Sequence, residues 1–128
     1  MTKLLEIEFD GLPPSVNQMY RNARVNTRYK TEKTREFQEK VVALMKKNRV
    51  LPNVFTGSIF VNVIFYVSDN RKWDIDNRLK VLFDCLQLAE IIKDDSQIDY
   101  IFAERSLFVE GNKTVLIVHG CSRKNENE

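Results

Sequence analysis

Four segments of the chain have the hydrophobic pattern of β-strands. Residues 4–9 alternate apolar and acidic side chains over their second half, which predicts a strand with one buried face. Residues 58–67 are apolar on both faces, interrupted by Asn62, as expected for a strand that is central or covered on both sides. Residues 98–109 and 113–119 form two further apolar runs, and the short Gly-Asn connection between them predicts an antiparallel hairpin.

Two other segments repeat apolar residues at helical spacing. Thr31 is the expected N-cap of a helix that runs to about Lys47 and carries the stripe Phe37, Val41, Leu44 and Met45. A second helix, capped by Asp76 or Asn77, is expected to run to about Glu90 with the stripe Leu79, Leu82, Phe83, Leu86 and Ala89. The order β-α-β-α-β-β predicts one α+β (mixed α/β) domain over residues 1–121, with about four strands and two helices, followed by a polar tail at 122–128.

The segment between the first strand and the first helix differs from the rest. Pro13-Pro14-Ser15-Val16-Asn17 excludes a helix and begins an irregular stretch that we expect to continue to about Lys30. Irregular loops of about 15 residues are uncommon in compact domains and are usually functional. Between residues 21 and 35, six basic side chains stand against Glu32 alone. This crowding favours contact with a DNA backbone over a merely solvated basic surface.

Composition limits the remaining choices. The 128 residues are 43% hydrophobic and 30% charged, as in an ordinary globular domain with its own core. The net charge of +2 by itself predicts no nucleic-acid partner. Cys85 and Cys121 form neither a disulfide framework nor a zinc pattern. The charged N-terminus and the lack of an apolar run near ~20 residues predict a cytoplasmic protein without membrane contact.

The candidate chemistry lies at Asp74-Ile75-Asp76. If these residues are extended, the two carboxylates share a face about 6.6 Å apart. They could then close on a hard cation such as Mg²⁺, which needs only one or two protein carboxylates. In the alternative interpretation, one aspartate caps the following helix and the other is solvated.

Lys80 and the pair Asp94-Asp95 add to this pattern. A lysine in the first turn of a helix opposes the macrodipole by about 0.3–1 kcal/mol, so Lys80 is a candidate for contact with a phosphate near the metal. The alternative is an i,i+4 ion pair with Asp84, in the less favourable orientation. Asp94-Asp95 could supply a third carboxylate or simply form an acidic turn. Two Mg²⁺ ions held this way would activate a water and stabilise a leaving oxygen.

Taken together, these segments resemble one known family. Asp74-Ile-Asp-Asn-Arg-Leu-Lys80, Phe83-Asp84-Cys-Leu86 and Ile92-Lys-Asp-Asp95 are similar to the RusA family of Holliday-junction resolvases, and Pro13-Pro14-Ser15-Val-Asn17 with Tyr20-Arg21 resembles its N-terminal segment. The resemblance covers nearly the whole chain in order and spacing. It implies a Mg²⁺-dependent homodimer that cleaves four-way DNA junctions symmetrically and is often encoded by phages or prophages.

The resemblance also implies roles for individual residues. Asp74, Asp76 and Asp95 would bind the metal and act in catalysis, with Lys80 as a catalytic or phosphate-contacting residue. In the pair Asp94-Asp95, only Asp95 corresponds to the third essential carboxylate of the family. Trp73 stands where the family frequently has a basic residue, and would stack on an exposed base or simply pack. The DNA contacts that we expect come from Asn17, Tyr20, Arg21, Arg24, Arg28, Lys30, Arg71, Lys72 and Asn77.

The sequence therefore predicts a structure-selective endodeoxyribonuclease of recombination and repair. One alternative is a non-catalytic module that binds branched DNA, which Mg²⁺-dependent nicking would exclude. Another is a different DxD metal-dependent phosphoryl-transfer enzyme, or a sugar-nucleotide transferase. A phosphatase with an aspartate nucleophile would continue as DxDx[TV], whereas Asn77-Arg78 follows here.

Overall fold

The computed structural model describes residues 1–15, 20–22, 28–30, 32–69, 75–108 and 110–121, and for 20–22 and 28–30 it describes the backbone alone. In chain order the elements are β1 (Thr2–Asp10), β2 (Tyr20–Asn22), β3 (Arg28–Lys30), α2 (Glu32–Asn48), β4 (Ser58–Val67), α3 (Asp76–Leu88), the 3₁₀ turn η1 (Asp95–Gln97), β5 (Ile98–Leu107) and β6 (Lys113–Cys121).

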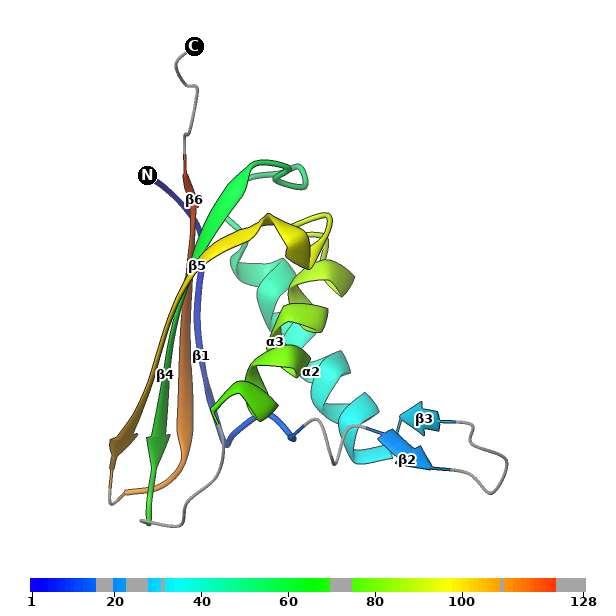
Figure 1. The fold of residues 1–128 in the computed structure, drawn as a ribbon, viewed down its shortest axis with the longest axis vertical. Coiled ribbons are helices and arrows are strands. Elements are labelled where there is room, and N and C mark those ends of the chain that lie inside the picture. The colour runs from blue at the N-terminus through cyan, green and yellow to red at the C-terminus, as the bar shows by residue number, and fades with distance from the viewer. Residues whose placement is uncertain (16–19, 23–27, 31, 70–74, 109, 122–128) are drawn as a thin grey trace.

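The main sheet has four strands in the order β1-β6-β4-β5. β4 pairs parallel with β5 and antiparallel with β6, and β6 pairs antiparallel with β1. Helices α2 and α3 lie together on one face of this sheet (Figure 1). The predicted mixed domain of four strands and two helices is confirmed, as is the central position of residues 58–67.

The core lies between the sheet and the two helices. The β4 side chains that face the helices, Ile59, Val61, Val63 and Phe65, are fully buried. α2 buries Val41 and Met45, and α3 buries Leu82 and Leu86 against them. Most of the two predicted helical stripes is confirmed by this layer; Phe37, Leu44 and Phe83 are partly buried at its margin.

The predicted hairpin between the last two strands is wrong. β5 and β6 follow one another along the chain, but β4 lies between them in the sheet. The connection instead bonds to the end of β4, where Phe108 donates its N–H to the carbonyl of Val67 at 2.7 Å. β4, α3 and β5 form a parallel β-α-β unit, so β5 pairs directly with β4 and lies at the edge, and β6 pairs antiparallel with the other side of β4. The strand predicted to reach Val109 ends at Leu107.

The predicted caps of the second helix are also wrong. The N-cap position is Ile75, which has helical backbone angles and makes no side-chain capping hydrogen bond. Asp76 is the first residue of α3, where its negative charge still favours the positive end of the helix dipole. The helix ends at Leu88, two residues before the predicted end. Thr31, the predicted cap of the first helix, lies outside the described residues, and that helix begins at Glu32.

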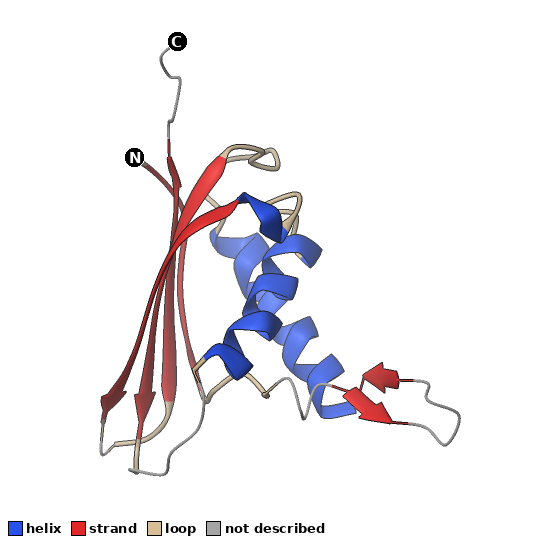
Figure 2. Cartoon of the chain, viewed as in Figure 1, coloured by secondary structure: helices blue, strands red, loops and turns tan. Residues whose placement is uncertain are grey.

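The segment predicted to be irregular contains a small sheet of its own. β2 and β3 pair antiparallel, with Tyr20 opposite Lys30 and Asn22 opposite Arg28. This pair of strands lies beyond the N-terminal end of α2, away from the main sheet (Figure 2). The sequence interpretation was wrong here because three-residue strands without an alternating apolar run carry no clear periodicity.

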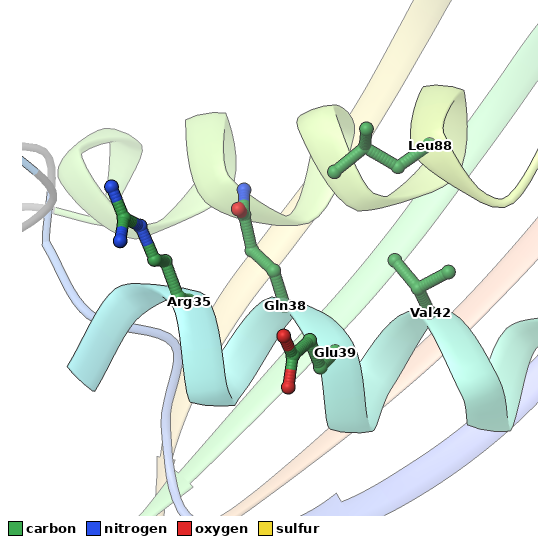
Figure 3. A pocket seen from close by; sticks show the side chains of 5 residues that line it. All are labelled: Arg35, Gln38, Glu39, Val42 and Leu88. Carbon is green, nitrogen blue, oxygen red and sulfur yellow. The ribbon is translucent and has the colours of Figure 1, made fainter. Parts of the chain in front are cut away.

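A shallow groove runs between the two helices. Its volume is about 390 Å³, and Figure 3 shows the residues that line it, Arg35, Gln38, Glu39 and Val42 on α2 and Leu88 on α3. The described residues around this groove include none of the predicted site residues. Within the described ranges, neither helix has the length and apolarity needed to cross a bilayer.

Candidate active site

Two of the predicted catalytic residues are in contact. The ammonium of Lys80 donates a hydrogen bond to Oδ2 of Asp95, with 3.3 Å between Nζ and the oxygen. It also lies 3.6 Å from Oδ1 of Asp84, one turn further along α3. The i,i+4 ion pair with Asp84 is therefore present, and the role of Lys80 in contacting a phosphate stays a prediction. Lys80 is the fifth residue of α3, so it lies just beyond the first turn in which it was predicted.

Asp95 is held in place through its backbone. It is the first residue of η1, and its N–H donates to Oε1 of Gln87 on α3 at 3.0 Å. This bond ties the turn to the helix that carries Lys80. The side chain of Asp95 stays 37% exposed and that of Lys80 52% exposed, so both groups are accessible to a phosphate and its water.

Asp94 and Asp95 have different surroundings. The carboxylate of Asp94 accepts a hydrogen bond from the N–H of Ser96 at 2.9 Å and caps η1. Asp94 is therefore occupied by the turn itself, whereas Asp95 faces Lys80. Asp94 therefore has the contact expected of an acidic turn, whereas the metal-binding role of Asp95 stays a prediction.

The pKa shifts follow from these contacts. The charge of Asp84, followed by the hydrogen bond to Asp95, raises the pKa of the Lys80 ammonium above its ordinary value. Hydrogen bonds from Ser96 lower the pKa of the Asp94 carboxyl. Lys80 therefore keeps its positive charge at neutral pH, as a group that contacts phosphate must.

The structure describes one of the two aspartates of the DxD motif, Asp76. Asp76 is exposed and lies one helical turn before Lys80, on the same face of α3. The extended conformation assumed for the motif is wrong at Ile75 and Asp76, because both have helical geometry. Asp74 lies outside the described residues. Among those that are described, no three His, Cys, Asp or Glu side chains group closely enough to hold a metal ion, so the three-aspartate site stays a prediction.

Arg78 was missed as a positioning element by the sequence reasoning. One of its terminal nitrogens, Nη1, donates to the carbonyl of Pro13 at 2.6 Å, and partial burial lowers the pKa of its guanidinium. This bond joins the Pro-Pro segment to the first turn of α3, although they are 65 residues apart. The available signal in the sequence was an arginine between two predicted site residues, Asn77 and Lys80.

The predicted DNA-contacting residues fall into three groups. Tyr20, Arg21, Arg28 and Lys30 lie on the paired strands β2 and β3, which places these four positions in one small sheet. Asn77 is half-buried in the first turn of α3. The remaining predicted DNA contacts lie outside the described residues; they are Asn17, Arg24, Arg71 and Lys72. Trp73 also lies outside the described residues.

Comparison with known proteins adds a family to this geometry. A family model described as Endodeoxyribonuclease RusA matches residues 10–118, which include the Pro-Pro segment, Asp76, Lys80 and Asp95. The chain belongs to the RusA family. The match extends from the end of β1 into β6, so it takes in both helices and the turn that carries Asp95.

Individual members of the RusA family show the same extent of similarity. The crossover junction endodeoxyribonuclease RusA of Enterobacteria phage HK97 is 33% identical over 102 residues, covering 79% of this chain and 82% of the phage protein. The proteins of the same name from Escherichia coli strain K12 and Shigella sonnei strain Ss046 are each 32% identical over 89 residues, or 69% of this chain and 72% of theirs.

Proposed function

We propose that this chain is a Mg²⁺-dependent endodeoxyribonuclease that resolves four-way DNA junctions. It would hydrolyse paired phosphodiesters during recombination and repair in the cytoplasm of a bacterial or phage-infected cell. The observation that carries the proposal is the RusA family match over residues 10–118. The contact between Lys80 and Asp95 supports it, because two residues to which the resemblance assigns catalysis meet across 15 residues of sequence.

The residues present fit a Mg²⁺ ion. Asp76 and Asp95 offer carboxylate oxygens, which Mg²⁺ prefers, and both side chains are exposed enough to share the ion with water. Together with Asp74 they would hold it beside α3. When bound, Mg²⁺ would polarise the scissile phosphate and lower the pKa of a coordinated water.

The other residues act through charge and position. The Lys80 ammonium would stabilise negative charge on the phosphate as the transition state forms. Arg78 fixes the start of α3 against the Pro13 carbonyl, which keeps Asn77 and Lys80 in register with the N-terminal segment. The basic side chains of residues 21–30, with Arg71 and Lys72, would contact flanking phosphates without reading sequence.

A homodimer completes the proposal. A four-way junction has approximate two-fold symmetry, so a C2 dimer would present one site to each of two opposed strands. The edge strand β5 exposes Tyr100, Ile101 and Phe102, apolar side chains of the kind that contacts between subunits use. Analytical ultracentrifugation of the purified protein, alone and with junction DNA, tests this part of the proposal.

The experiment that tests the function is a cleavage panel. Purified protein is incubated with four-way, three-way, flap and linear DNA of equal length, with Mg²⁺ or with EDTA. We expect paired incisions in the four-way junction with Mg²⁺, and intact DNA with EDTA. Binding without incision in every condition would instead identify a non-catalytic module. Hydrolysis of a phosphomonoester or nucleotide sugar, with the junction left intact, would identify a different DxD enzyme.

We expect Lys80→Ala to slow cleavage far more than it weakens binding. Removing one group that stabilises transition-state charge typically slows reaction by about 10²–10³-fold, whereas one lost cation on this exposed surface changes affinity only a few-fold. Single-turnover cleavage and electrophoretic binding with Ca²⁺ measure the two effects separately. Lys93→Ala, which removes an exposed lysine beside the same turn, is the matched control. Equal losses of rate and affinity in Lys80→Ala would reassign Lys80 to DNA affinity.

A further inference from the structure

The side-chain amide of Gln97 joins two segments of the chain, because both its oxygen and its nitrogen form hydrogen bonds. Its Oε1 accepts hydrogen bonds from the backbone N–H groups of Lys93 at 2.7 Å and Asp94 at 2.9 Å. Its Nε2 donates to the carbonyls of Phe55 at 2.8 Å and Gly57 at 2.9 Å. One side chain therefore closes the turn that contains Asp95 and fastens it to the segment leading into β4.

The segment on which Gln97 is anchored is itself fixed to the sheet. The N–H of Phe55 donates to the carbonyl of Ile91 at 3.0 Å, and Phe55 and Ile92 form an isolated parallel bridge. The ring of Phe55 lies over Gly120 of β6, so closely that a Cβ atom there would be 2.5 Å from Cζ of the ring. Because Phe55 is partly buried against the core, its carbonyl is a rigid acceptor for Gln97.

The turn is thus held from two sides, with Asp95 between them. Gln97 ties residues 93 and 94 to the start of β4, and Gln87 accepts the N–H of Asp95 from α3. Both glutamine side chains bond to backbone groups rather than to the carboxylate of Asp95. They fix the backbone that aims this carboxylate at the Lys80 ammonium.

We infer that Gln97 is a positioning residue, which orders the 93–97 turn so that Asp95 meets Lys80 and the metal. This inference rests on the proposed function of the Asp95 site. An exposed turn without this anchor would sample several orientations, and misplacing a catalytic group by about 1 Å costs on the order of 10²-fold in rate. Residues that orient metal ligands typically contribute about 10–100-fold to metal affinity or activity.

Two variants of Gln97 separate its two sets of hydrogen bonds. Gln97→Met keeps the side-chain length but removes all four bonds. Gln97→Glu keeps an acceptor for Lys93 and Asp94 but cannot donate to Phe55 and Gly57. We expect Gln97→Met to slow single-turnover junction cleavage about 10–100-fold and to raise the Mg²⁺ concentration needed for half-maximal rate. Junction binding without divalent metal should stay within about twofold of wild type. Gln97→Glu should lie between wild type and Gln97→Met.

A further measurement does not depend on activity. Amide hydrogen exchange in the metal-free protein should become at least about tenfold faster at residues 94–96 in Gln97→Met, with α2 unchanged, because the turn loses its anchor. Arg49→Met is the control for general destabilisation. Arg49 also links distant segments, but the carbonyls to which it donates, those of Leu51, Ala89 and Glu90, all lie outside the 93–97 turn.

The outcomes distinguish this inference from the proposed function. If the wild-type protein cleaves no DNA in the panel, the proposed function fails and the inference fails with it. If the wild type cleaves but Gln97→Met loses no more rate than Arg49→Met, the inference alone is overturned. Unchanged amide exchange at residues 94–96 in Gln97→Met would show that Gln97 does not order the turn. A Gln97→Glu cleavage rate equal to wild type would show that the bonds to Phe55 and Gly57 do not contribute to positioning Asp95.

Discussion

Asp95→Asn is expected to reduce the rate of junction cleavage by at least about 100-fold while leaving junction binding intact. Residues that only orient a metal ligand contribute about 10–100-fold, so loss of the ligand's own charge should have at least the larger effect. Asparagine also weakens the contact with Lys80, because an amide oxygen carries no full negative charge to pair with the ammonium. Single-turnover kinetics with a labelled four-way junction, at saturating protein, measure this loss.

The neighbouring aspartate provides a matched control. Asp94→Asn changes the same charge at the adjacent position, but asparagine caps a helical turn about as well as aspartate. We therefore expect Asp94→Asn to cleave within about threefold of wild type. If the two variants lose activity equally, the distinction between the two carboxylates is wrong and the turn contributes only its total charge. Wild-type rates in Asp95→Asn would remove Asp95 from the site.

Gly120→Ala is expected to lower the free energy of unfolding by about 1–3 kcal/mol. The added Cβ atom would lie 2.5 Å from Cζ of Phe55 and 2.9 Å from two further ring carbons. The ring is partly buried against the core and also lies close to Gly57, where an added Cβ would be 3.1 Å from Cε2 of the ring, and overpacking of this kind costs about that much. Urea denaturation followed by circular dichroism at 25 °C measures the change.

A double-mutant cycle isolates the cause of this effect. In a Phe55→Leu background the smaller side chain leaves space for the new methyl group, so the added cost of Gly120→Ala should fall to below about 1 kcal/mol. The same cost in both backgrounds would place the strain elsewhere in β6. Because Phe55 also carries the carbonyl that anchors Gln97, Gly120→Ala should additionally raise the Mg²⁺ requirement of cleavage.

Local sequence predicted the elements well where burial dictates the pattern. The strand at 58–67 was predicted with the bounds that the structure has, because every second side chain is fully buried. The two helices were predicted to within about two residues at their ends, since their apolar stripes face one continuous core. The small β2–β3 sheet was not predicted, because its three-residue strands, Tyr-Arg-Asn and Arg-Tyr-Lys, contain no apolar alternation that a pattern could reveal.

Strand order required information that no local window contains. A short connection with Gly111 and Asn112 is compatible with a hairpin, and the same residues also allow the chain to pass the end of β4. The order follows from a long-range pairing instead. The chain crosses from β4 through α3 to β5, which pairs parallel with β4, so β6 pairs with β4 on its other side and with β1.

The amino-acid sequence specifies the chemistry available to this protein: the acidic residues, Lys80, the basic N-terminal segment and their order, which carry the resemblance to the RusA family. Which of these groups meet depends on how the chain folds. The pairing of Lys80 with Asp95 rather than Asp94 depends on bonds from Gln87 and Gln97 and on a phenylalanine ring seated on Gly120. Such contacts join residues far apart along the chain, and their energies arise from packing and hydrogen-bond geometry that exist only after folding.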